Sequence, residues 1–157
     1  MKVGMIGLGR MGEGMSRRMI KKGIEVHGYR NNYAKAEEQF EKGYISGCTT
    51  SLESLVQVVK QKQSIYGEKS GETIVSEQPG IFMMVVPAET VEDTINELLQ
   101  FCSEGDIIID HGNSNFKDSR RRAERLAKLG IAYIDCGTSG GVFGLERGYC
   151  LMVGGGN

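Results

Sequence analysis

The chain has 157 residues, of which 39% are apolar, so it can form one compact domain with a core but is too short for two domains of usual size. Its 19 Lys and Arg residues nearly balance its 20 Asp and Glu residues, which provides neither the basic field of a nucleic-acid-binding protein nor the acidic excess typical of disorder. The four cysteines form no CxxC pair, and no apolar run reaches the roughly 18 residues of a membrane span. We therefore expect a cytoplasmic protein with no metal site and no nucleic-acid or membrane partner.

The first 60 residues alternate between strand and helix patterns. An apolar strand over residues 2–6 leads into a glycine turn and a helix over about residues 11–22, which Gly23 ends. This order opens a β–α–β unit. The elements expected next are a strand at 24–29, a helix at 33–42, a brief strand at 44–46 and a helix at 52–59 that Ser51 caps.

The same alternation continues in the second half of the chain. The elements expected there are a buried strand at 81–86 ended by Pro87, a helix at about 90–102, a strand at 107–110, a charged helix at about 117–129 and a strand at 131–135. Strands separated by helices of this length predict a doubly wound, mainly parallel sheet. The expected fold is therefore a three-layer α/β/α domain of the Rossmann type.

One segment interrupts this alternation of strands and helices. Residues 60–80 are polar, contain Gly67, Gly71 and Pro79, and are longer than most connections in compact α/β domains. We interpret them as an insertion. Within it, residues 73–76 are either an extra edge strand or part of a surface loop, and the composition favours the loop.

A glycine fingerprint follows the first strand directly and opens the first helix. Its residues are Gly7, Leu8, Gly9, Arg10, Met11 and Gly12. Gly7 permits a tight turn, Gly9 allows the backbone to approach a pyrophosphate, and Gly12 lets the helix pack closely on the strand. The amino terminus of the helix adds unpaired N–H groups and the positive end of its dipole. The pattern predicts that residues 1–157 form a dinucleotide-binding domain.

The end of the second strand bears on the choice of cofactor. Domains that prefer NAD place an acidic residue there, against the ribose hydroxyls, whereas an arginine accommodates the 2′-phosphate of NADP. Here Arg30 takes the place of the acid, and Asn31 and Asn32 follow it as further hydrogen-bond donors. We therefore expect NADP, with NAD as the alternative if Arg30 is only a solvated turn residue.

Three polar or kinked segments follow the later strands. They are residues 85–88, residues 110–114 and residues 135–141, each at the expected carboxyl end of a strand. In a parallel sheet such ends share one edge, and ligands bind in the crevice beside it. We expect these segments to converge on the cofactor crevice.

These segments carry a resemblance to a known family. GLGRMG near the start, DHGNSNFKDSRRR and DCGTSGGVFGLERGYCLMVGG together resemble 6-phosphogluconate dehydrogenase, the last segment most closely its shorter-chain branch. The resemblance spans the chain except for residues 60–80. Members oxidise 6-phosphogluconate and decarboxylate it to ribulose 5-phosphate and carbon dioxide in the pentose phosphate pathway, which implies a phosphorylated sugar acid as the small-molecule partner.

The resemblance also implies residue roles. The cofactor would lie on the residues of the fingerprint, on Arg30, Asn31 and Asn32, and, near its nicotinamide side, on Val85, Val86 and Pro87. Asn113 would contact both cofactor and substrate. The sugar acid would contact Ser139, Gly140 and Gly141, where adjacent glycines open backbone N–H groups to a ligand and the hydroxyl adds a directional partner.

Some features depart from the family pattern or remain outside it. His111 stands where many relatives carry glycine, and we expect a supporting or partly exposed residue rather than a catalytic one. Asp118 with Arg120, Arg121 and Arg122 is expected to start a helix with a solvated basic face. The proton-transferring lysine and glutamate of the family belong to a helical domain that follows this one, so the catalytic residues are expected outside the chain.

We therefore expect a fragment of a longer oxidoreductase, inactive alone, with its boundary in the glycine-rich stretch at 154–156 as in a domain linker. The longer enzyme is expected to be a homo-oligomer, whereas no motif predicts the state of the fragment. Two alternatives stay open. One is the domain of a related 3-hydroxyacid dehydrogenase, and the other is a non-catalytic NADP-binding module.

Overall fold

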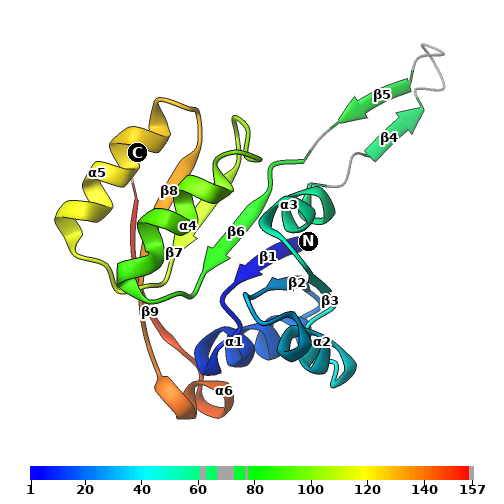
Figure 1. The fold of residues 1–157 in the computed structure, drawn as a ribbon, viewed down its shortest axis with the longest axis vertical. Coiled ribbons are helices and arrows are strands. Elements are labelled where there is room, and N and C mark those ends of the chain that lie inside the picture. The colour runs from blue at the N-terminus through cyan, green and yellow to red at the C-terminus, as the bar shows by residue number, and fades with distance from the viewer. Residues whose placement is uncertain (61–62, 67–72, 77, 156–157) are drawn as a thin grey trace.

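A seven-stranded sheet forms the centre of the molecule, in the order β3-β2-β1-β6-β7-β8-β9 (Figure 1). The computed structural model describes residues 1–60, 63–66, 73–76 and 78–155. All neighbouring strands of this sheet run parallel except β8 and β9, which are antiparallel. The strands are β1 (Lys2–Ile6), β2 (Glu25–Tyr29), β3 (Gly47–Thr49), β6 (Ile81–Met84), β7 (Ile107–Asp110), β8 (Ala132–Ser139) and β9 (Cys150–Gly155).

Helices cover both faces of the sheet, which confirms the expected three-layer Rossmann architecture. They are α1 (Arg10–Ile20), α2 (Tyr33–Glu41), α3 (Leu52–Val59), α4 (Val91–Leu98), α5 (Phe116–Ala127) and α6 (Gly144–Arg147), with short 3-10 turns η1 (Ala88–Thr90) and η2 (Gly141–Phe143). Met15 of α1 and Ala36 of α2 belong to one apolar core, whereas the buried apolar residues of α3, α4 and α5 belong to a second core. The two cores lie on opposite faces because successive strand residues point to opposite sides.

Helix α3 illustrates how the local sequence sets an element. Its buried residues Leu52, Leu55, Val56 and Val59 recur at helical spacing and form one apolar face. At its start, the Ser51 hydroxyl accepts a hydrogen bond from the Ser54 amide at 3.1 Å, and the Ser54 hydroxyl accepts one from the Ser51 amide at 3.2 Å. This reciprocal cap confirms Ser51 as the N-cap residue and fixes where the helix begins.

The strand ends align across the sheet. Ile6 is the register partner of both Tyr29 and Met84, Met84 is the partner of Asp110, and Asp110 is the partner of Asp135. The strand order reverses between β1, β2 and β3 on one side and β6, β7 and β8 on the other. The segments that follow these strands therefore meet at one edge, at the switch point where α/β sheets bind ligands.

Some of the predicted strand bounds were wrong. The third strand is Gly47–Thr49 rather than residues 44–46, because Gly43, with φ of +68°, and the Tyr44 amide, bonded to the Gln39 carbonyl, still belong to the end of α2. Strand β8 continues past residue 135 to Ser139, because it pairs with β9, a strand that was not predicted. Gly154 and Gly155 accordingly lie in β9 and not in a linker.

Part of the predicted insertion is a separate two-stranded sheet. Strand β4 (Gln63–Tyr66) pairs antiparallel with β5 (Thr73–Ser76), so residues 73–76 are a strand, although they do not extend the edge of the main sheet. Residues 61–62, 67–72 and 77 of the predicted insertion lie outside the described residues. The buried Asp106 carboxylate holds both ends of the segment, because it pairs with the Lys60 ammonium at 3.0 Å and accepts from the Gly80 amide at 2.8 Å.

Candidate functional site

The fingerprint forms the turn from β1 into α1, and two of its glycines are required by close backbone contacts. Gly7 has φ of +92°, and a Cβ there would lie 2.3 Å from the Val85 carbonyl oxygen. A Cβ on Gly12 would lie 2.0 Å from the Gly7 carbonyl oxygen. These contacts confirm the tight turn and the close packing of helix on strand that the spacing predicted.

Gly9 plays a different part, because it leaves the amino terminus of α1 open. It is the N-cap of α1 and makes no side-chain cap, and a Cβ added to it would meet no atom within 4 Å. The first helical hydrogen bond runs from the Glu13 amide to the Gly9 carbonyl, so the preceding N–H groups have no partner inside the helix. The open space and the free donors together suit an anion such as a pyrophosphate.

The end of β2 lies against the fingerprint turn. The Arg30 guanidinium donates to the Leu8 carbonyl at 3.1 Å, and the Gln39 amide donates to the same oxygen at 3.1 Å. Asn32 is the N-cap of α2, where its side-chain oxygen accepts from the Lys35 amide at 3.3 Å. Asn31 and Asn32 are exposed. The structure thus brings the predicted ribose-end residues together with the predicted pyrophosphate residues.

The segment after β6 lies beside the same turn. The Val85 amide donates to the Ile6 carbonyl at 2.8 Å, which continues the pairing of β6 with β1 by one residue. Val85 and Val86 are half-buried, whereas Pro87 is exposed and precedes η1. Strand β6 ends at Met84, so the predicted strand end at residue 86 was wrong and Pro87 lies beyond the strand. The two valines offer apolar side chains at the switch point.

Asp110, the last residue of β7, organises the loop that follows it. It is fully buried and accepts hydrogen bonds from the Gly112 amide at 2.8 Å, the Ser114 hydroxyl at 2.8 Å and the Tyr133 hydroxyl at 2.6 Å. Burial and the neighbouring Asp110 carboxylate raise the pKa of Tyr133, so its hydroxyl keeps its proton for this bond. A carboxylate with several donors is well satisfied in the interior, and here it fixes the backbone of residues 111–114.

Arg122 corrects the prediction of a solvated basic face. Its side chain is only 5% exposed, lies 3.5 Å from the Asp110 carboxylate, and donates to Glu92 at 2.9 Å and to the Ser114 hydroxyl at 3.0 Å. Partial burial raises the pKa of Glu92, but the guanidinium groups of Arg122 and Arg125 outweigh it and hold that pKa below its ordinary value. Arg122 is therefore part of the loop support, because a buried guanidinium needs carboxylate partners.

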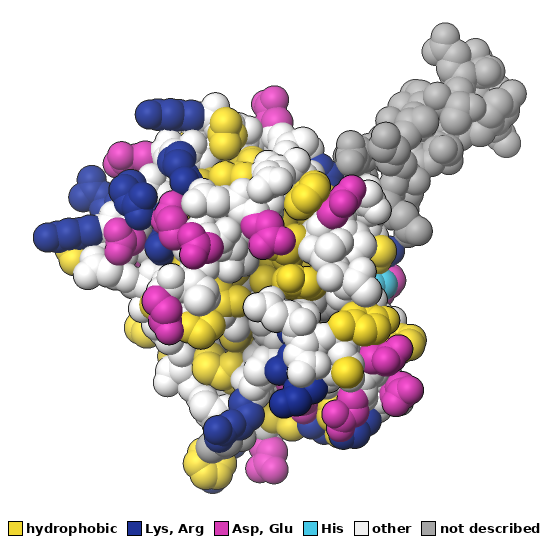
Figure 2. All heavy atoms as spheres, in the orientation of Figure 1, with side chains coloured by type: hydrophobic (Ala, Val, Ile, Leu, Met, Phe, Trp, Pro, Cys, Tyr) yellow, Lys and Arg dark blue, Asp and Glu magenta, His cyan; other side chains and the backbone are white. Residues whose placement is uncertain are grey.

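The two arginines that precede Arg122 in this helix do lie at the surface. Arg120 and Arg121 are exposed, and Arg121 pairs with Glu92 at 3.0 Å and with Asp118 at 3.4 Å. Figure 2 shows basic and acidic side chains interspersed over α4 and α5 rather than a single basic patch. The prediction of a solvated face is correct for these residues, and it is wrong for Arg122 alone of the three arginines.

Asn113 links the loop after β7 to the end of β8. It is exposed and has φ of +53°, a left-handed conformation that asparagine tolerates better than most residues. Its side-chain oxygen accepts from the Thr138 amide at 3.1 Å, and its side-chain nitrogen donates to the Thr138 carbonyl at 3.4 Å. Thr138 directly precedes Ser139, so the structure joins the predicted residues of the cofactor and substrate segments.

The predicted substrate residues begin at the end of β8. Ser139 is exposed and pairs in register with Cys150 of β9. Gly140 and Gly141 follow with φ of +145° and +46°, conformations that side chains other than glycine rarely adopt. The chain turns there into η2 and α6, which directly follow the exposed Ser139 and the two glycines.

A contact between α1 and this turn was not predicted. Tyr149 fills the space beside two glycines, since a Cβ on Gly14 would lie 2.1 Å from its hydroxyl and a Cβ on Gly144 would lie 2.1 Å from its ring. The Arg18 guanidinium donates to the Leu145 carbonyl at 2.9 Å. These contacts attach the helix of the fingerprint to the turn after Ser139. A glycine inside α1, where no turn requires one, was the signal in the sequence.

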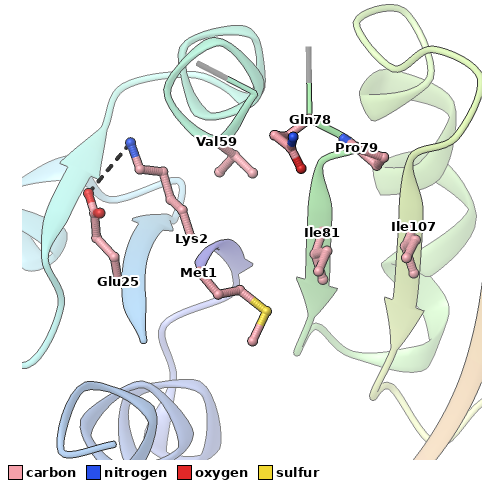
Figure 3. A pocket seen from close by; sticks show the side chains of 8 residues that line it. All are labelled: Met1, Lys2, Glu25, Val59, Gln78, Pro79, Ile81 and Ile107. Carbon is pink, nitrogen blue, oxygen red and sulfur yellow. Dashed lines mark ion pairs between the residues drawn. The ribbon is translucent and has the colours of Figure 1, made fainter. Parts of the chain in front are cut away.

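A cavity of about 670 Å³ lies at the amino ends of the strands. It is lined by Met1, Lys2, Glu25, Val59, Gln78, Pro79, Ile81 and Ile107 (Figure 3). Its charged groups, Lys2 and Glu25, pair with each other at 3.5 Å. The cavity faces the amino ends of the strands, away from the fingerprint and from Asn113, so we do not assign the candidate site to it.

In the part of the chain that the structure describes, no three His, Cys, Asp or Glu side chains are grouped so that they could bind a metal ion. No helix among those residues is both long enough and apolar enough to cross a bilayer. The candidate site itself lies at the carboxyl edge of the sheet, where the strand ends, the fingerprint and Asn113 meet.

Comparisons with known proteins agree with this geometry. A family model described as the NAD binding domain of 6-phosphogluconate dehydrogenase matches residues 2–157. A Bacillus subtilis protein named as a candidate 6-phosphogluconate dehydrogenase is 35% identical over 99% of this chain and 46% of its own length. The decarboxylating 6-phosphogluconate dehydrogenase of Candida albicans is 36% identical over 98% of this chain and 27% of its own length.

Solved structures show the same relationship. The 6-phosphogluconate dehydrogenase of Plasmodium falciparum superposes with a TM-score of 0.77 at 27% identity and covers 98% of this chain and 30% of its own. The 3-hydroxyisobutyrate dehydrogenase of Salmonella typhimurium has a TM-score of 0.72 at 21% identity over 97% of this chain and 47% of its own, which indicates the shared fold alone. The chain thus spans less than half the length of each of these relatives. It belongs to the family of NAD-binding domains of 6-phosphogluconate dehydrogenase.

Proposed function

We propose that this chain supplies the cofactor site and part of the substrate site of an enzyme that oxidises 6-phosphogluconate with NADP and decarboxylates it to ribulose 5-phosphate and carbon dioxide. One observation carries the proposal: the two side-chain hydrogen bonds of Asn113 to Thr138 join the loop at the cofactor crevice to the strand that ends at Ser139. A single loop connecting both segments suits a reaction in which cofactor and sugar acid must touch each other.

The residues of the fingerprint fit a dinucleotide. The open space at Gly9 would admit the pyrophosphate to the free N–H groups at the start of α1, and the helix dipole would favour its charge. Val85, Val86 and Pro87, which follow β6, would lie along the nicotinamide side, where the two valines would exclude water from it. When bound, the nicotinamide accepts a hydride; these residues only hold and orient it.

Arg30 would select NADP over NAD. The guanidinium already bonds to the Leu8 carbonyl through one nitrogen, and its remaining N–H groups suit the 2′-phosphate. Asn31 and Asn32 are exposed beside it, and Asn32 has side-chain N–H groups left over from its role as N-cap. An acid in place of Arg30 would instead suit the ribose hydroxyls of NAD.

The sugar acid would lie between Asn113 and the turn after β8. A side-chain amide has two N–H donors, so Asn113 can keep its bond to Thr138 and donate the second proton to a ligand. The exposed Ser139 hydroxyl and the backbone of Gly140 and Gly141 would provide further partners. This set binds and orients the substrate, but it contains no lysine or carboxylate to move the hydroxyl proton.

We further propose that the proton-transferring lysine and glutamate belong to the part of the protein beyond residues 1–157. Both proton transfers need an acid or base at the reacting atoms, because positioning alone leaves them unassisted. The relatives are two to nearly four times as long as the matched region, which leaves room for such a domain. On this proposal the chain alone binds cofactor without turnover, and subunit contacts come from the longer protein.

The proposal is tested with the natural protein that carries this chain. We expect oxidation of 6-phosphogluconate with NADP to yield one reduced cofactor for each carbon dioxide released, with 3-hydroxyisobutyrate as the comparison substrate. Turnover of 3-hydroxyisobutyrate in place of 6-phosphogluconate would move the assignment to the 3-hydroxyacid dehydrogenases. NADP binding without turnover of either compound would favour a non-catalytic cofactor-binding module.

A further inference from the structure

His111 is a buried polar residue in the candidate site that the proposed function does not use. It follows Asp110 at the end of β7, its side chain is 3% exposed, and its amide donates to the Met84 carbonyl at 2.8 Å. Its Nδ1 lies 2.8 Å from the Thr138 hydroxyl. His111 therefore lies beside the same residue to which Asn113 is bound, one position before Ser139.

The hydrogen bonds of Thr138 determine the tautomer of this histidine. The Thr138 hydroxyl has a single proton, which it donates to the Cys136 carbonyl at 3.0 Å. It can therefore only accept from His111, so the proton of the neutral ring is on Nδ1. Nε2 is left with an unshared electron pair and acts as an acceptor.

No partner for this acceptor is found among the described residues. The Nε2 atom is buried and has no hydrogen-bond donor within reach. Burial lowers the pKa of His111, although the nearby Asp110 carboxylate opposes the effect, so the ring stays neutral around pH 7 and Nε2 remains an acceptor. A buried polar atom without a partner is costly and uncommon, and its retention at a ligand site indicates a partner supplied by the ligand.

We propose that His111 is a specificity-determining residue of this site, whose Nε2 accepts a hydrogen bond from an N–H or O–H group of the bound ligands. The inference rests on the proposed function, which supplies two sources of such a donor: the carboxamide of the nicotinamide and a hydroxyl of the sugar acid. Thr138 is the positioning residue, because it holds the tautomer that presents the electron pair.

Two substitutions separate the two ends of the ring. His111→Asn keeps an amide near the position of Nδ1, where it can still bond to Thr138, but removes the distal acceptor. His111→Gln extends an amide to the position of Nε2 and restores an acceptor there. Binding of NADP and of 6-phosphogluconate is measured by calorimetry on the natural protein that carries this chain, with His27→Asn, a change at the other histidine of the sequence, as the matched control.

We expect His111→Asn to weaken one of the two ligands about tenfold, as one lost hydrogen bond allows, and His111→Gln to restore most of that affinity. The 3-acetylpyridine analogue of NADP, which lacks the carboxamide N–H, identifies the source. If the carboxamide is the donor, the unaltered protein prefers NADP to the analogue about tenfold and His111→Asn abolishes the preference. If the sugar hydroxyl is the donor, only 6-phosphogluconate binding changes.

The comparison of NADP with its analogue uses the unaltered protein, so it does not depend on whether a variant folds. Thermal unfolding tests whether each variant is folded. Equal affinities of the unaltered protein and His111→Asn for both ligands would overturn the inference and leave the proposed function standing. So would a loss in His111→Asn that His111→Gln does not restore, since that pattern indicates a structural role. A protein that binds neither ligand, even unaltered, would instead contradict the proposed function.

Discussion

The carboxyl edge of the sheet is built in two different ways. Around α1, the backbone itself makes the site, because Gly7 and Gly12 permit contacts that a Cβ would prevent and Gly9 leaves the helix terminus open. Around β7 and β8, side chains make the site, because Asp110 and Thr138 hold a loop through hydrogen bonds. On the proposed function, the first part would bind what every dinucleotide shares, and the second part could vary with the ligand.

The two parts also differ in the range of their contacts along the chain. The fingerprint is a run of six residues, and its spacing alone specifies the turn. The support of the loop joins Asp110 to Tyr133, Asn113 to Thr138 and Arg122 to Glu92, pairs separated by 23, 25 and 30 positions. A site of the second kind depends on the packing of whole elements, so its disruption spreads further through the fold.

The largest effect is expected from Gly7→Ala. The new Cβ would meet the Val85 carbonyl at 2.3 Å in a conformation with φ of +92°, so strand or helix must shift. We expect the free energy of unfolding to fall by about 3–5 kcal/mol, measured by urea denaturation. Gly9→Ala is the matched control: its Cβ meets no atom within 4 Å, so stability should change by less than about 1 kcal/mol. Equal losses of stability in the two variants would contradict the interpretation that close backbone contacts build the part of the site around α1.

A smaller effect is expected from Asp110→Asn. An amide has a single acceptor oxygen, so it can serve either the Gly112 amide at Oδ1 or the donors that meet at Oδ2, and a buried donor loses its partner. It also carries no charge to pair with the buried guanidinium of Arg122. We expect a loss of about 3 kcal/mol in unfolding free energy. Asp118→Asn, at a half-exposed carboxylate of α5, should cost less than about 0.5 kcal/mol. If both changes have similar effects, the loop does not depend on Asp110.

Much of the fold could be predicted because its signals are local. Apolar runs such as those of β6 and β7, the cap at Ser51 and the fingerprint each specify a structure within a few residues. The doubly wound, mainly parallel sheet then follows from the alternation of strands and helices. The candidate residues at the strand ends came together for the same reason, since parallel strands place their carboxyl ends at one edge.

The rest depends on contacts between distant segments. Arg122 has the same local sequence context as the exposed Arg120 and Arg121, and only the position of Asp110 and Glu92 shows that it is buried. Strand β9 is exposed along its whole length, so its pattern lacks the buried face that identifies a strand, and β8 alone makes it one. The contact of Tyr149 with α1 joins residues 135 positions apart, from Gly14 to Tyr149.

Cofactor selection tests whether a side chain also contributes to ligand binding in the part of the site around α1. Arg30→Asp should weaken NADP by about 1.5–3 kcal/mol, the usual contribution of a hydrogen bond to a charged group, and leave NAD nearly unchanged. Calorimetric titration with both cofactors at matched salt measures the difference. Arg120→Asp makes the same charge change on the exposed face of α5 and should affect both cofactors alike. Equal losses of NADP and NAD in Arg30→Asp would mean that Arg30 supports the turn through Leu8 and does not read the phosphate.

The smallest expected effect is a pH dependence of stability that arises only in the part of the site around β7 and β8. Burial lowers the pKa of His111 below its ordinary value of about 6.5, so in mildly acidic solution the unfolded chain takes up a proton that the folded chain does not. The contribution of the neutral ring to stability is complete above about pH 6.5. It is lost as the pH falls through the lower pKa that His111 has in the folded chain. The slope is at most about 1.4 kcal/mol per pH unit for one proton.

Urea denaturation between about pH 7.5 and 5.5 measures this slope and avoids most of the titration of carboxylates. The His111→Asn variant has no titrating side chain at position 111, so its stability should fall less than that of the unaltered chain, while both proteins retain His27. Gly9→Ala, a change in the backbone half, should keep the full slope. Parallel curves for the unaltered chain and His111→Asn would show that His111 titrates alike in both states, and the buried ring could then not be the neutral acceptor that the second half of the site requires.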